Sequence, residues 1–120
     1  MKKITSVISI AALAVFSALP FTAKAADDEA TTVKGEILDM ACYLDHGAQG
    51  EKHAACAQKC IASGLPVGIK TDDGKVYIVI GAHQPLNKEL APEAGKVVTL
   101  KGKAVSKDGV NLLENAEIVK

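Results

Sequence analysis

The sequence predicts a mainly β domain with short helices, arranged as a five-stranded OB-fold-like barrel with a helix inserted between strands 1 and 2. Five segments have strand-like composition, and Asp-Gly pairs at 73–74 and 108–109 mark two hairpin turns. Residues 51–62 are alanine-rich and contain no glycine or proline, which favours a helix between the first two strands. A short helix is expected between the third and fourth strands. An open α+β meander is the alternative arrangement.

The first 25 residues have the three parts of a secretory signal peptide. The basic start at Lys2-Lys3 is followed by an apolar run from Ile4 to Leu19, and Ala23-Lys24-Ala25 supplies small residues at a cleavage site. We therefore expect cleavage after Ala25 and a periplasmic location. The apolar run is short for a spanning helix, so no membrane span is expected after cleavage.

The remaining chain is mildly acidic and lacks the side chains that nucleic-acid-binding proteins use. Residues 26–30 carry three acidic groups and predict a disordered leader, followed by one domain over residues 31–120. Cleavage removes three of the fourteen lysines, leaving eleven basic residues against fourteen acidic ones. The chain has no arginine, and Tyr43 and Tyr77 are the aromatic residues that remain. We expect no nucleic-acid partner.

The first strand is expected from Thr31 to Cys42, because apolar and polar residues alternate in its middle. This strand would place Leu38, Met40 and Cys42 on one face. A loop over residues 44–50 and the helix over residues 51–62 follow, with Gly64 as a left-handed cap.

The second half of the chain is predicted to supply the other strands. They are expected at residues 67–70, 76–80, 96–105 and 110–119, the last broken around Glu114-Asn115. A short helix over residues 85–90 would be stopped by Pro92, and Gly102 would allow a long strand to bend.

Two patterns carry a resemblance to known proteins. The run from Gly95 to Ala104, the Asp108-Gly109 turn and the closing Glu117-Ile118-Val119 resemble the second half of small bacterial secreted OB-fold domains. The second pattern is similar to bacterial exported proteins with a Cys/His-rich helical insertion, and comprises Cys42-Tyr43-Leu44, Gly47, Gly50, His53, Cys56-Ala57, Cys60, Gly64, Pro66 and Gly68. The resemblance implies a fold and a compartment but no established activity. Some exported OB-fold proteins bind copper through Met, His and aromatic groups, whereas this chain has no tryptophan and a different residue set.

All three cysteines lie in the predicted insertion, where they suggest a metal site. On a helix, His53, Cys56 and Cys60 share an arc of about 60°. With Cys42 arriving from the strand end, they form a Cys3His set suited to zinc. Met40 and His46 are further candidate ligands, and a soft set of Cys, Met and His also suits Cu(I).

A disulfide is the main alternative, because cysteines usually pair in an oxidising compartment. Cys42 would bond to Cys56 or Cys60 and leave one thiol over. The protein would then be a non-catalytic, disulfide-stapled OB-fold module that binds a periplasmic protein or a small ligand. Thiol-redox chemistry is a smaller alternative, because the sequence contains no C-x-x-C motif. Non-covalent haem is expected less than zinc or copper.

We expect a binding protein rather than an enzyme. The sequence contains no nucleophile elbow, phosphate loop or paired catalytic carboxylates. His83 is expected at a turn or helix start.

Overall fold

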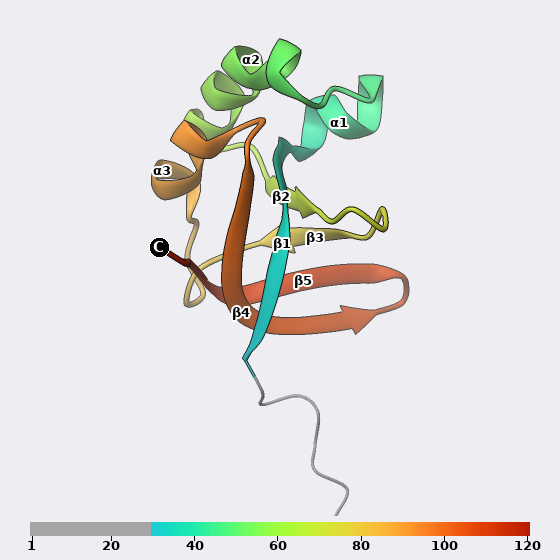
Figure 1. Cartoon of the computed structure of the whole chain (residues 1–120), viewed down its shortest axis with the longest axis vertical. Coiled ribbons are helices and arrows are strands. Elements are labelled where there is room, and N and C mark those ends of the chain that lie inside the picture. The colour runs from blue at the N-terminus through green and yellow to red at the C-terminus, as the bar shows by residue number, and fades with distance from the viewer. Residues whose placement is uncertain (1–29) are drawn as a thin grey trace, which may run out of the picture.

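The computed structural model describes residues 30–120, in which five strands are combined with short helices (Figure 1). In chain order the elements are β1 (Thr31–Asp39), α1 (Met40–His46), α2 (Glu51–Ala62), β2 (Val67–Lys70), β3 (Val76–Val79), α3 (Asn87–Leu90), the 3-10 helix η2 (Ala91–Glu93), β4 (Val97–Lys107) and β5 (Val110–Ile118). The predicted signal peptide and residues 26–29 of the predicted leader lie outside the described residues.

The five strands close into a barrel in the order β1-β2-β3-β5-β4. β1 completes the closure because it pairs antiparallel with β2 on one side and with β4 on the other. β3 and β5 form the parallel pair, with Ile78 opposite Leu112. The predicted OB-fold-like barrel, with a helix between β1 and β2, is therefore confirmed, and the chain does not form the open meander.

The barrel core is built from inward-facing aliphatic side chains of all five strands. Its fully buried members include Ile37, Ile69, Leu100 and Leu113, and the largest contributions from the helices are Ile61 and Leu90. Burial of each such side chain contributes roughly 1.5–3 kcal/mol relative to an exposed position. The helices are thus part of the core rather than appendages to it.

At Gly102, strand β4 approaches β5 closely. A β-carbon at this position would lie 2.7 Å from the Glu114 carbonyl oxygen, and the register of the two strands shifts between Lys101 and Lys103. Asn115 takes up the shift with a left-handed φ of 53°. The predicted break around Glu114-Asn115 is therefore a bulge within a continuous β5.

The first strand is shorter than predicted, since it ends at Asp39 and Cys42 belongs to a helix. The Asp39 carboxylate accepts hydrogen bonds from the backbone N–H groups of Ala41 and Cys42, both at 3.2 Å, and so caps α1. Gly47, with a φ of 66°, ends this helix by donating its N–H to the Tyr43 carbonyl. The predicted loop over residues 44–50 accordingly begins only after His46.

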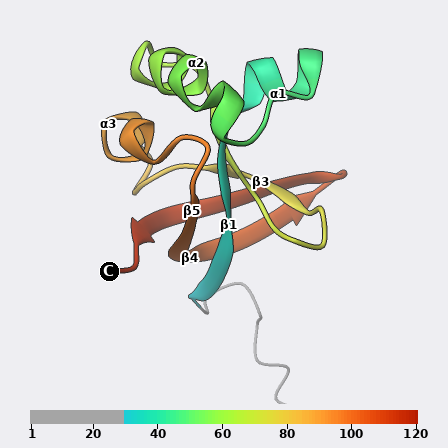
Figure 2. The ribbon, with the colours of Figure 1, turned by 45° about the horizontal axis from the view of Figure 1, so that its top comes forward.

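Both α1 and α2 lie at the same end of the barrel, and α3 lies beside α2 (Figures 1 and 2). The bounds of α2, Glu51–Ala62, are those predicted. This helix packs tightly against Gly95, where a β-carbon would lie 2.8 Å from the Ala54 β-carbon. Within residues 30–120, no helix is long and apolar enough to cross a membrane.

Candidate metal centre

The three cysteines converge where α1 meets α2. Cys42 comes from the first turn of α1, while Cys56 and Cys60 are one turn apart on α2. The three sulfur atoms all lie within 4.8 Å of one another, and all three cysteines are free. Cys42 and Cys60 are half-buried, and Cys56 is exposed to solvent. The group is therefore accessible from outside the protein.

Asp39 is a buried carboxylate three residues before Cys42, and only 2 % of its surface is exposed. Its carboxylate hydrogen-bonds the Cys42 thiol, and this bond, together with burial, raises the pKa of Cys42 to about 12. Burial, followed by the negative charge of Asp39, also raises the pKa of Cys60. Both thiols consequently stay protonated at neutral pH in the metal-free protein, and a metal must displace their protons to bind.

A cavity of about 250 Å³ opens beside the cluster. Its walls are formed by Asp39, Cys42, His46, Ala48, His53, Cys56 and Ala57. Both predicted histidine ligands therefore line this cavity, and both are exposed. Their ring nitrogens do not belong to the group formed by the three sulfur atoms. The structure thus brings together three of the four residues of the predicted Cys3His set, with His53 adjacent.

Met40, a further predicted ligand, is buried and packs against β2. Its sulfur occupies the space that a β-carbon at Gly68 would need. Its backbone N–H donates to the Pro66 carbonyl at 3.0 Å. Because Met40 begins α1 instead of continuing β1, it does not share a strand face with Cys42.

Two residues of the barrel hold the loop between α1 and α2 in place. The carboxylate of Glu36, on β1, accepts a hydrogen bond from the Gly50 N–H. The ammonium group of Lys70, on β2, donates to the Gln49 side chain at 3.0 Å and lies 5.3 Å from the centre of the Tyr43 ring. Sequence reasoning missed both residues, because nothing local indicates which loop a strand side chain will reach.

The other end of α2 is held by α3. The amide nitrogen of Asn87 donates to the carbonyls of Ile61 and Leu65, at 2.8 Å each. The Ser63 hydroxyl donates to the Cys60 carbonyl at 2.7 Å. Asn87 therefore ties the C-terminal end of α2 to α3, and Ser63 bonds back to the last turn of α2.

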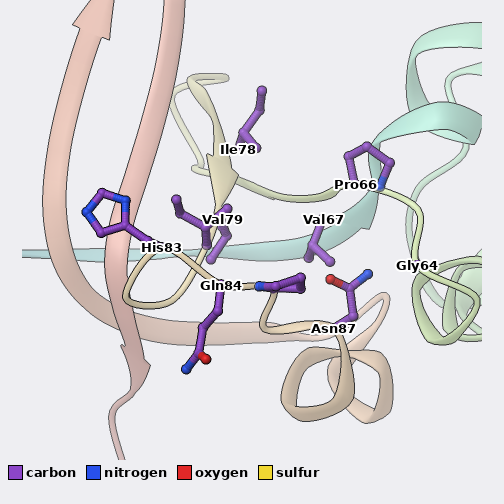
Figure 3. Close-up of a pocket in the computed structure, with 10 residues that line it drawn as sticks. Gly64, Pro66, Val67, Ile78, Val79, His83, Gln84 and Asn87 are labelled. Atoms are coloured by element: carbon purple, nitrogen blue, oxygen red, sulfur yellow. The ribbon is translucent and has the colours of Figure 1, made fainter.

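A second hollow, of about 460 Å³, is lined by Pro66 and Val67 among other residues (Figure 3). His83 lies at its edge in a turn, with a left-handed φ of 53°, which agrees with the turn position predicted for it. No cysteine lines this hollow, and the Asn87 amide in its wall already bonds two carbonyls. It offers no comparable set of metal ligands.

Fold and site together define a small OB-fold-like barrel with a three-cysteine cluster at its helical end. Comparisons with protein-family models, curated proteins and solved structures found no match to this chain.

Proposed function

We propose that this is a small periplasmic protein that binds a transition metal, zinc or Cu(I), through Cys42, Cys56 and Cys60. The proposal rests on one observation, the approach of all three sulfur atoms to within 4.8 Å of one another. Around a tetrahedral zinc with Zn–S bonds of about 2.3 Å, two sulfurs lie about 3.8 Å apart. Small side-chain rotations therefore suffice to close the cluster on an ion. Three thiolates equally suit Cu(I), which prefers soft ligands.

The protein has its own candidates for a fourth ligand. His53 lies one turn before Cys56 on α2, and His46 ends α1, so both can turn toward the cluster from the wall of the cavity. Met40 is the weaker candidate because its sulfur is packed against Gly68. Asp39 supports the site indirectly, by fixing the start of the helix that carries Cys42.

A disulfide-stapled interaction module is the second candidate, favoured by the closeness of the three sulfur atoms, which all lie within 4.8 Å of one another. In an oxidising compartment, Cys42 can therefore bond to Cys56 or Cys60. Such a bond would join α1 to α2 and leave one thiol free. The barrel would then serve as a binding scaffold for a protein partner.

One measurement separates the two candidates. The exported full-length protein is purified without chelator, and its mass is determined under native and denaturing conditions with thiol counting. We expect one metal per chain and three free thiols once the metal is removed. Absence of metal together with one oxidised cysteine pair would reject metal binding and support the module.

Single substitutions then assign the ligands. Zinc binding is expected to weaken on the order of 100-fold in each of the variants Cys42→Ser, Cys56→Ser and Cys60→Ser. Loss of a residue that only supports a metal ligand usually costs about 10- to 100-fold in affinity, and loss of a ligand itself should cost at least as much. Ala55→Ser, an exposed position on the same helix, is the matched control and leaves affinity unchanged. The N-terminus of the exported protein, expected at Ala26, tests the proposed signal cleavage in the same samples.

A further inference from the structure

We propose that the bound metal keeps one coordination position open, and that this position takes an uncharged nitrogen or sulfur donor that enters from outside through the cavity between α1 and α2. The inference rests on the metal-binding function proposed above. It assigns a ligand class to the site, namely an imidazole or a thioether.

The three cysteines are placed unequally around the cavity. Cys42 and Cys56 form part of its wall, whereas Cys60 does not line it. A metal bound to all three sulfurs therefore lies at the cavity wall, with Cys60 on the side away from the opening. Its remaining coordination position consequently faces the cavity.

The size of the cavity favours an exchangeable ligand over a closed site. Structural zinc sites are closed by four protein ligands, whereas sites that act on another molecule keep a position open. The cavity holds about 250 Å³, and a water molecule occupies about 30 Å³ in the liquid. The small side chains of Ala48 and Ala57 line it, and neither His46 nor His53 has a ring nitrogen in the sulfur group. The space is therefore larger than one water ligand needs.

The charge of the site selects the donor. Three thiolates around a divalent ion carry a net charge of about −1, or about −2 around Cu(I), and the buried Asp39 adds a further negative charge nearby. None of the residues lining the cavity is a lysine. An anion entering it would be repelled and would find no compensating cation, so a neutral donor is preferred.

The test uses the full chain loaded with Co²⁺, whose visible spectrum reports its coordination shell. Imidazole is added at pH 8, and azide serves as an anionic ligand of similar size. We expect a saturable spectral change with imidazole, and a change with azide only at concentrations on the order of tenfold higher. A blocked Gly-His-Gly peptide is the third arm. Binding of the peptide assigns the position to a partner's side chain, and binding of free imidazole alone assigns it to a small molecule.

Variants of the two histidines make the inference refutable. Imidazole is expected to bind the unchanged protein, in which His46 and His53 are both present, and not only His53→Ala or His46→Ala. If imidazole binds only after one histidine is removed, the chain closes its own site and the inference is wrong, although metal binding stands. Azide binding as tightly as imidazole would overturn the charge argument. Failure of Co²⁺, Zn²⁺ and Cu(I) alike to bind at the three cysteines would overturn the proposed function itself.

Discussion

Asp39 and Cys42 are linked through both backbone and side chain. The carboxylate of Asp39 accepts the backbone N–H of Cys42 at 3.2 Å and also bonds the Cys42 thiol. One buried carboxylate thus starts helix α1, positions the cysteine three residues later, and keeps the thiol of that cysteine protonated.

Replacing this carboxylate by an amide should lower the pKa of the Cys42 thiol. Asp39→Asn keeps an oxygen that can cap α1 but removes the charge, so the pKa of Cys42 falls from about 12 toward its ordinary value of 9.0. Alkylation of Cys42 in the metal-free protein at pH 9 should then become faster. Trypsin places each cysteine on its own peptide, residues 35–52, 53–59 and 60–70, so each rate is read separately. Asp45→Asn, at an exposed residue of α1, is the control, and equal Cys42 rates in both variants would contradict the proposed link.

Metal affinity should rise steeply with pH. Binding must displace protons from the thiols, and the raised pKa values of Cys42 and Cys60 keep those protons bound well above neutrality. Below pH 8 we expect the logarithm of the zinc affinity to increase by at least about two per pH unit, one each for Cys42 and Cys60. Competition with a chromophoric chelator from pH 6 to pH 9 measures this slope. A flat profile would show that the cysteines are not the ligands.

The packing of α2 against Gly95 should be sensitive to a single added methyl group. Gly95→Ala places a β-carbon 2.8 Å from that of Ala54, in addition to the strain of its left-handed φ of 75°. We expect a loss of about 2–4 kcal/mol in unfolding free energy and weaker metal binding, because α2 must shift. Gly109→Ala is the matched control, since Gly109 has a φ of 84° and open space around it. If the two variants lose equal stability, the contact with α2 is unimportant.

The bonds from α3 to the end of α2 can be tested with an isosteric change. Asn87→Asp replaces a donor with a carboxylate that faces the carbonyls of Ile61 and Leu65, so two hydrogen bonds become repulsive contacts. Urea denaturation should show a loss of about 2–4 kcal/mol. Asn115→Asp, at an exposed residue of β5, should change stability by less than about 0.5 kcal/mol. A similar loss in both variants would point to charge alone.

Barrel and inserted helix could be predicted from the sequence because their signals are local. Residues 51–62 lie between helix-breaking glycines, and Asp-Gly pairs mark both hairpin turns. Helix α1 was missed because Leu38, Met40 and Cys42 continue a period-two pattern, while Asp39 acts as a helix cap at the same place. A pattern of alternation cannot show which of these two signals prevails.

The cysteine cluster was predictable only in part. Helical spacing correctly placed Cys56 and Cys60 together. A shared helix face shows which side chains point the same way, but not whether their ligand atoms come close enough to one another. The spacing therefore could not exclude His53 from the sulfur group. The position of Cys42 depends on how α1 packs against α2, which is decided by distant residues such as Glu36 and Lys70.

Residues 42–60 contain every member of the cysteine cluster, whereas closing the barrel brings Thr31 opposite Gly102. The chain entropy lost in assembling the cluster is therefore that of a short segment, and the larger loss falls on the pairing of β1 with β4. The segment that carries the cysteine cluster is thus a nearly self-contained length of chain, inserted between two strands as a binding loop is inserted in a scaffold.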